Sequence, residues 1–216
     1  MPPTRYRKSV GSGTGATWRL LACALLAVAG AACEPASAKT ETSGAPIVMV
    51  SSEVASVDAP LPDFDLVDQK GRKVKRADLA GKVWVTDFIF TTCGSICPKL
   101  TQTMSAVAAD VTDPGVRFVS ITVDPENDTP EKLDAYATKY GADPSRWIFL
   151  TGEPREVEQT ILKGFRVALG KSAGGEIFHA ERFVVVDKKG TVRGIYDAND
   201  AGIAELKLRV RSLLAE

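Results

Sequence analysis

The sequence predicts an α/β fold in which helices flank a mixed β-sheet. Apolar runs rich in β-branched and aromatic residues alternate with stretches of helical spacing, an order typical of a sheet covered by helices. Towards the end of the chain a hairpin pattern and one last helix replace this alternation, so we expect antiparallel strands beside the parallel ones. A pair of cysteines stands directly after the first buried strand.

The predicted strands are short apolar segments bounded by turn residues. Apolar and polar residues alternate from Phe64 and the chain turns at Gly71, which indicates a β-hairpin added at the N-terminal side of the main sheet. The run 82–90 is almost wholly apolar and is therefore expected to be a buried strand. An apolar segment at 47–51 could form a loose additional strand. Further strands are expected at 116–123, 147–150, 183–187 and 191–196.

Proline and capping residues mark where the helices begin. Pro98 follows Cys97 at the start of a stretch with helical spacing, and Pro130 follows the capping residue Thr129. A helix is therefore expected to begin at each of these two places. Two more helices are expected at 153–165 and 201–214.

Residues 1–33 are expected to be an export signal that is not part of the fold. Basic residues precede a 13-residue apolar run at 20–32, which is shorter than the roughly 20 residues that a spanning helix needs. Three outcomes are open: lipidation of Cys33, ordinary cleavage after Ala38, or an uncleaved anchor. We favour the lipoprotein, because small residues run up to Cys33. Each outcome places the domain outside the cytoplasm, on the periplasmic side of a bacterial membrane.

Residues 34–58 are interpreted as a flexible tether, because they are rich in Ala, Ser, Thr and Pro and show no sustained periodicity. Residues 59–216 are then the folded domain. The 27 basic and 27 acidic residues of the chain balance, which argues against a nucleic-acid partner. We take a monomer as the default expectation.

Cys93 and Cys97 carry the clearest chemical signal. Cys23 lies within the signal and Cys33 at its end, so one local pair is left in the domain, and such a pair cannot staple a small disulfide-bonded fold. A thiolate is both a nucleophile and a metal ligand, and the N-terminus of a helix stabilises it. A redox pair in this place is typical of the thioredoxin fold.

The spacing of the two cysteines leaves their chemistry open. Three residues separate Cys93 from Cys97, whereas thiol oxidoreductases usually have two. Positions four apart on a helix share a face, so both sulfurs can bind one ion, and a disulfide is also compatible with the spacing. The alternative without function is a pair of small buried side chains packed for volume.

His179 is the only histidine of the chain. A lone histidine is more often structural than a ligand, and sequence spacing alone cannot bring it to the cysteines. Two sulfurs and one imidazole would suit Cu(I), and also Cu(II) with further ligands. Zinc is the alternative metal, although a structural zinc site needs a fourth protein ligand and none is evident.

Four ordered motifs resemble those of the Sco/SenC family of copper proteins. They are residues 84–93 (WVTDFIFTTC) with Cys97-Pro98, residues 123–130 (VDPENDTP), residues 147–152 (WIFLTG) and Phe178-His179. The resemblance runs from about residue 59 to residue 216. It implies a thioredoxin-like domain with one copper per chain, as Cu(I) or Cu(II), bound by Cys93, Cys97 and His179. It also implies a role in assembling the dinuclear CuA site of cytochrome c oxidase.

The chain departs from the family pattern at two places. Ala180 follows the histidine where Ser or Thr is frequent, and Gly94-Ser95 stands where some members have proline and an acidic residue. We expect these changes to alter the affinity or redox balance of the site and not to abolish binding.

Two carboxylates are secondary candidates. Asp87 lies in the buried strand at the position where thioredoxins have an acidic residue, which the resemblance links to proton transfer with the buried cysteine; otherwise it is a surface-facing or hydrogen-bonded strand residue. Asp124, together with Glu126 and Asp128, forms an acidic loop at the end of a strand, where the functional edge of an α/β sheet lies. The alternative for this loop is that Asp128 and Thr129 cap the following helix.

Three functions fit these residues. The first is a copper metallochaperone whose dithiol binds copper and whose disulfide does not, with an oxidase subunit carrying CuA, other copper chaperones and the membrane as partners. The second is an enzyme, a thiol–disulfide reductase that acts on the cysteines of the oxidase. The third is a copper or redox sensor. His179 separates the first from the second, because a reductase does not need it.

Overall fold

The computed structural model describes residues 58–94, 96–171, 177–179 and 181–216. The predicted signal with Cys33, the additional strand at 47–51 and all but the last residue of the tether lie outside these residues. No helix within the described ranges is both long enough and apolar enough to cross a membrane.

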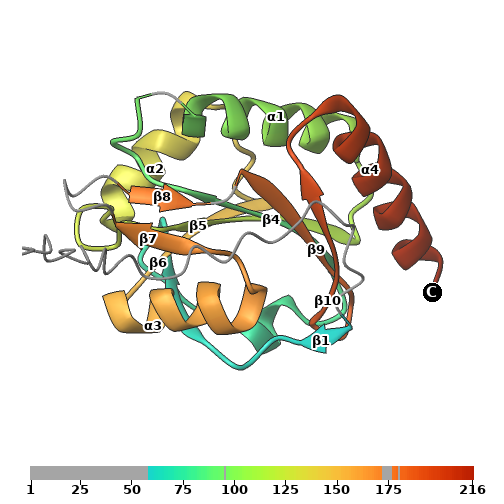
Figure 1. Cartoon of the computed structure of the whole chain (residues 1–216), viewed down its shortest axis with the longest axis horizontal. Helices are drawn as coiled ribbons and strands as arrows, with labels where there is room; N and C mark the ends of the chain where they lie inside the picture. Colours follow the sequence, from blue (N-terminus) through green and yellow to red (C-terminus); the bar gives the residue numbers. More distant parts are fainter. Residues whose placement is uncertain (1–57, 95, 172–176, 180) are drawn as a thin grey trace, which may run out of the picture. The chain divides into compact units, whose positions relative to one another are not determined.

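The main sheet has eight strands in the order β1-β10-β9-β4-β5-β6-β2-β3 (Figure 1). Strands β4, β5 and β6 are parallel, while β9 and β2 join them antiparallel on either side. The sheet strands are β1 (Ala59–Pro60), β2 (Asp65–Asp68), β3 (Lys73–Lys75), β4 (Val83–Ile89), β5 (Val116–Thr122), β6 (Trp147–Thr151), β9 (Arg182–Val186) and β10 (Thr191–Asp197). The sheet is therefore mixed, as predicted.

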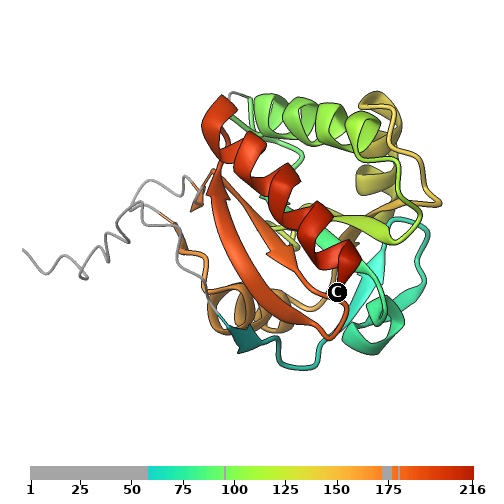
Figure 2. The same cartoon turned by 90° about the vertical axis from the view of Figure 1, so that its right-hand side faces the viewer.

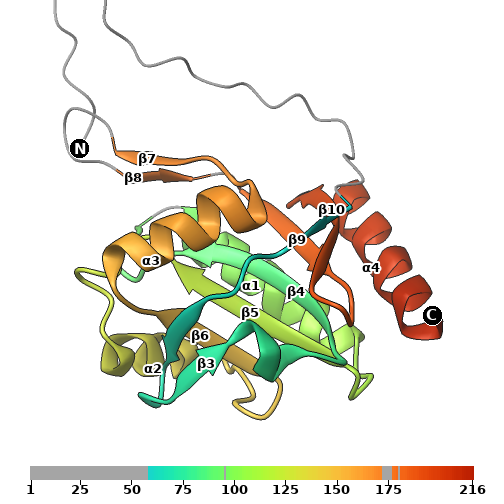
Figure 3. The ribbon, with the colours of Figure 1, turned by 90° about the horizontal axis from the view of Figure 1, so that it is seen from below.

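Helices cover both faces of this sheet. Helices α1 and α4 lie on one side of it and α3 on the other (Figures 1 and 2). A separate antiparallel hairpin, β7–β8, lies next to α3 in the view from below (Figure 3). The helices are α1 (Ile96–Asp110), α2 (Pro130–Lys139), α3 (Pro154–Gln159) and α4 (Asp200–Ala215), with short turns η1 (Arg76–Leu79) and η2 (Thr160–Phe165) and hairpin strands β7 (Leu169–Lys171) and β8 (Ile177–His179).

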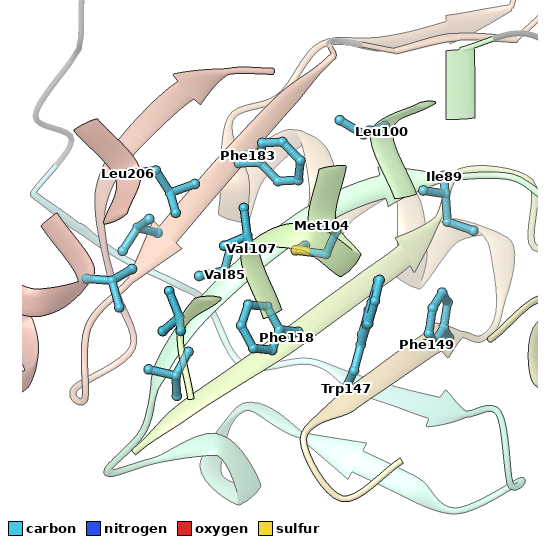
Figure 4. Packing of buried hydrophobic residues seen from close by; sticks show 14 of the residues in the cluster. Val85, Ile89, Leu100, Met104, Val107, Phe118, Trp147, Phe149, Phe183 and Leu206 are labelled. Carbon is cyan, nitrogen blue, oxygen red and sulfur yellow. The ribbon is translucent and has the colours of Figure 1, made fainter. Parts of the chain in front are cut away.

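The side chains of β4 pack into two hydrophobic cores, one on each face of the sheet, because successive side chains of a strand point to opposite faces. Val85 and Ile89 pack against the face covered by α1, α2 and α4, together with Met104 (Figure 4). Trp84 and Phe88 pack into the other core, with α3 and the η2 turn. All seven residues of β4 are buried, which explains the apolar run in the sequence.

Within the residues that the structure describes, the predicted elements are present, with two corrections. The helix expected at 153–165 divides into α3 and the π-helical turn η2, which ends at Arg166 in a left-handed conformation (φ 56°). Within η2, a Cβ at Gly164 would lie 3.3 Å from Leu61, so the chain here packs closely against the N-terminal segment. The second correction is the β7–β8 hairpin, which lies between the expected helix at 153–165 and the expected strand at 183–187, where no strand was predicted.

Both edges of the eight-stranded sheet are short. Strand β1 has two residues, one of which is Pro60, and β3 has three, with exposed Lys73 and Lys75 on either side of buried Val74. The parallel strands β4 and β5 lie in the interior, and their carboxyl ends meet at the same edge of the sheet. The cysteines follow directly from that edge.

Candidate metal centre

Cys93 and Cys97 lie at the corner between β4 and α1. Strand β4 ends at Ile89, the chain turns, and α1 begins at Ile96, so Cys97 belongs to the first turn of the helix. The turn is closed by a hydrogen bond from the Cys93 N–H to the Phe90 carbonyl at 3.3 Å. The strand-to-helix corner expected from the sequence is therefore present.

The two sulfurs differ in exposure and share a hydrogen bond. Cys97 is fully buried in the core between α1 and β4, while Cys93 is partly exposed, and both are thiols in the structure. The backbone N–H of Cys97 donates to the Sγ of Cys93 at 3.3 Å. This N–H is one of the donors that a helix N-terminus leaves without a helical partner, and a donor aimed at sulfur stabilises negative charge on it.

Cys97 is held as a thiol by its surroundings. Burial raises the pKa of Cys97 most, the hydrogen bond with Cys93 raises it further, and the charges of Cys93 and Asp87 act in the same direction. A Cys97 thiolate without a partner would be a costly buried negative charge. A bond to a metal ion or to a second sulfur in place of the proton avoids this cost. Cys93 is thus placed to react first and Cys97 to complete the site.

Asp87 is buried beneath the same helix, on the face of β4 that carries Val85 and Ile89. Its Oδ1 accepts a hydrogen bond from Ser120 Oγ at 2.5 Å, and Ser120 in turn accepts one from Trp147 Nε1 at 2.9 Å. No hydrogen-bond partner within the described residues reaches Oδ2. Burial therefore raises the pKa of Asp87 to about 7, although the bond from Ser120 lowers it. Asp87 is hydrogen-bonded but does not face the surface.

Asp124 lies at the carboxyl end of β5 and lines a pocket of about 250 Å³. Its side chain is buried and accepts a hydrogen bond from Asn127 Nδ2 at 2.9 Å. The pocket is also lined by Glu126 and, from the β7 side, by Leu169 and Gly170. Asp124 therefore lies at a pocket that is also lined by β7, the partner strand of β8.

The interpretation of Asp128 as a helix-capping residue is wrong. Thr129 caps α2 by accepting the N–H of Lys132 at 3.4 Å. The side chain of Asp128 is fully buried and binds Thr91, in the loop before the cysteines, and Thr122. Sequence reasoning missed this role, because a capping aspartate and an aspartate that binds a distant loop look the same in one sequence. The hydroxyl residue Thr122 at the end of an apolar strand was the available signal.

His179 ends strand β8, where its Cα is paired with that of Leu169 in β7. The structure thus connects His179 to the pocket beside Asp124 through its partner strand. Among the side chains that the structure describes, no three of His, Cys, Asp and Glu gather in a way that would hold a metal ion. Cys93 and Cys97 are brought together as predicted, and His179 as their third partner stays a prediction.

The donor set at this corner fits copper. Two sulfurs at a helix N-terminus, one buried and one accessible, are soft ligands of the kind that Cu(I) prefers. An imidazole would complete a three-coordinate set that also suits Cu(II) with a further ligand.

The sheet, the covering helices and the dithiol after the first buried strand define a protein of thioredoxin-like fold. Residues 54–215 match the family model SCO1/SenC, and the chain belongs to this family. The SCO1 protein homolog of Bacillus subtilis is 37% identical over 140 residues, which are 62% of this chain and 72% of the relative.

Solved structures support the same assignment. A SCO1/SenC family lipoprotein from Bacillus anthracis superposes with a TM-score of 0.67 at 32% identity, covering 74% of this chain and 97% of the other. BsSco, a member of the Sco family of cytochrome c oxidase assembly proteins in which a disulfide switch was identified, gives 0.66 at 32%, covering 74% and 96%. Arabidopsis thaliana ScoI with copper bound gives 0.62 at 25%, covering 73% and 99%.

Proposed function

We propose that this protein is a copper metallochaperone that helps to load the CuA site of cytochrome c oxidase. The observation that carries the proposal is the sulfur pair: a partly exposed Cys93 that accepts the Cys97 N–H, next to a buried Cys97. Membership of the SCO1/SenC family supports it, as do a copper-bound relative and a relative counted among the oxidase assembly proteins.

In this proposal Cys93, Cys97 and His179 bind one copper ion as cargo. Cys93 meets the ion first because it is accessible, and Cys97 gives up its proton when the ion arrives. His179, at the end of β8, is the third ligand in this proposal. When a disulfide oxidant takes up two electrons and two protons from the pair, Cys93 and Cys97 form a disulfide and both sulfur ligands are lost. The redox state of the pair therefore controls whether copper is held.

An anaerobic copper titration of the reduced protein tests this function. We expect one Cu(I) per chain, sulfur charge-transfer absorption, and an EPR signal when Cu(II) is used. Loss of any one ligand should weaken copper binding by more than the roughly 10- to 100-fold that follows from changing a residue that only hydrogen-bonds a ligand. The variants are Cys93→Ser, Cys97→Ser and His179→Ala. Gln102→Ala, an exposed change on α1, is the control. Full copper affinity in His179→Ala would overturn the ligand assignment.

The partial exposure of Cys93 favours one alternative, a thiol–disulfide reductase that acts on oxidase cysteines. The dithiol would pass two electrons and two protons to a target disulfide and become a disulfide itself. Absence of copper binding by the wild-type protein, with rapid reduction of an oxidised peptide carrying the CuA cysteines, would favour this function over the first.

We also propose that the chain is tethered outside the cytoplasm through lipid on Cys33. The apolar run before this cysteine and a lipoprotein among the relatives support the proposal. Cys33→Ala should move the protein out of the membrane fraction, and mass spectrometry of the wild-type N-terminus should show a lipidated cysteine. Membrane retention of Cys33→Ala at the wild-type level would argue for an uncleaved anchor.

A further inference from the structure

The carboxylate of Asp128 joins the loop after β5 to the loop that carries the cysteines. Its two oxygens accept the backbone N–H of Thr91 at 3.1 and 3.3 Å, and Oδ1 accepts the Thr91 hydroxyl at 2.5 Å. Oδ2 also accepts the hydroxyl of Thr122 at 2.5 Å. Asp128 is fully buried, so this small network is shielded from water.

These contacts act on the chain just before the first sulfur. Thr91 lies between the end of β4 and Cys93, and the next hydrogen bonds along the chain are from Cys93 N–H to Phe90 and from Cys97 N–H to Cys93 Sγ. Asp128, Thr91 and Cys93 therefore form a continuous connection from the β5–α2 loop to the sulfur pair. At the other end of this network, the hydroxyl of Thr122 accepts the N–H of Asp124. The same hydrogen bonds therefore hold the β5–α2 loop, which lines the pocket beside Asp124.

A buried aspartate with several donors is not by itself a sign of function. Asp68 is buried to a similar degree, and it accepts the N–H groups of Lys70 and Arg72 and the Arg72 side chain. These donors belong to its own β2–β3 turn. Asp128, in contrast, takes two donors from Thr91, in a loop distant in sequence and next to a sulfur ligand. Asp68 therefore stabilises its own turn, whereas Asp128 stabilises the loop that carries Cys93.

We propose that Asp128 is a positioning residue for the copper and redox centre, because its hydrogen bonds to Thr91 set where Cys93 stands relative to Cys97. This inference rests on the proposed function and assigns the control of that site to a residue outside the ligand set. A loop held at one end by Asp128 presents both sulfurs in one arrangement, which raises their effective concentration toward each other and toward a single ion.

The test compares Asp128→Asn with Asp68→Asn in the full chain. Asn removes one acceptor and the charge at each place with little change of shape. We expect Asp128→Asn to lower Cu(I) affinity about tenfold, at the lower end of outer-shell effects. We expect Asp68→Asn to lose stability toward urea and to keep wild-type affinity. Equal copper affinities of Asp128→Asn and the wild-type protein, at a temperature where both are folded, would overturn the proposal.

A second measurement needs no metal. The reduced protein is equilibrated with glutathione disulfide, which takes up two electrons and two protons as two glutathione thiols while Cys93 and Cys97 form their disulfide. A loosened cysteine loop should shift this equilibrium toward the dithiol in Asp128→Asn and leave it unchanged in Asp68→Asn. A change in stability alone would not move it. An unchanged equilibrium in Asp128→Asn counts against the positioning role.

Thr91 supplies variants that keep the proposal testable if Asp128→Asn does not fold. Thr91→Val removes the hydroxyl donor and keeps the backbone donor, so both readouts should change by an intermediate amount. Thr91→Ser restores the hydroxyl and should restore both. Identical behaviour of the Val and Ser variants would overturn the inference. If the wild-type protein binds no copper, the proposed function fails, and the glutathione equilibrium still decides the role of Asp128.

Discussion

Replacing Asp87 by Asn should change how the stability of the protein depends on pH. Burial raises the pKa of Asp87 from 3.8 to about 7, with the hydrogen bond from Ser120 opposing the change. The folded protein therefore keeps a proton that the unfolded chain loses near pH 4. Below pH 4 both states are protonated and the favourable contribution is fully present, and it is lost as the pH rises through about 7.

The size of the effect follows from the two pKa values. A difference of about 3 corresponds to about 4 kcal/mol, because one pKa unit is worth 1.36 kcal/mol. Asp87 is fully buried, so water does not screen this contribution at the side chain itself. Asp87→Asn has no proton to lose, so its free energy of unfolding relative to the wild-type protein should rise by about 4 kcal/mol between pH 4 and pH 9.

Urea unfolding of the reduced proteins, followed by tryptophan fluorescence at several pH values, measures this difference. Other carboxylates titrate equally in both proteins and cancel. Ser120→Ala removes the donor that opposes the change, so the pKa of Asp87 in the folded protein should rise further. Its loss of stability should begin at the same pH as in the wild-type protein and continue to higher pH. Stability curves of the wild-type protein and Asp87→Asn that run parallel from pH 4 to pH 9 would refute the reasoning, since Asp87 would then be ionised throughout.

Four further outcomes are expected. At pH 8 iodoacetamide should modify Cys93 well before Cys97, because burial raises the pKa of Cys97, and mass spectrometry of peptides reads this directly. Asp87→Asn should bring forward the modification of Cys97, since it removes a charge that raises this pKa. Met104→Ala should cost about 2–5 kcal/mol in urea unfolding, whereas exposed Leu208→Ala should cost almost nothing. Gly202→Ala should cost about 1–3 kcal/mol by the same measurement, because its Cβ would strike the backbone carbonyl of Asp197; wild-type stability would contradict the close contact.

The sequence predicted the sheet and the helices where the pattern of apolar residues is strong. Strand β4 is apolar and buried on both faces, and α2 starts at a capping threonine followed by proline, so local chemistry decides both. The β7–β8 hairpin was missed because its glycines predict a loop. The π-helical turn before Arg166 was missed because its apolar spacing resembles that of an ordinary helix.

In the candidate site, too, the sequence predicted the features that depend on neighbouring residues and missed those that depend on distant ones. Cys93 and Cys97 could be placed at a helix N-terminus from their neighbours alone, and the structure brings them together there. The sequence could not reveal that one sulfur would be buried and the other partly exposed. Asp128 was misjudged because its partner Thr91 lies 37 residues away along the chain, and long-range hydrogen bonds leave no local pattern. His179 depends on family resemblance, since no local rule connects it to the cysteines.

The short edges of the main sheet have a consequence for the protein at high concentration. A long, flat edge strand exposes a row of hydrogen-bonding groups on which a second chain can add, and this is a common route to aggregation. Here one edge ends in Pro60, which lacks an N–H, and the other carries Lys73 and Lys75, whose like charges repel a second copy. Copies of the protein at high concentration therefore have little opportunity to pair through the backbones of these edge strands.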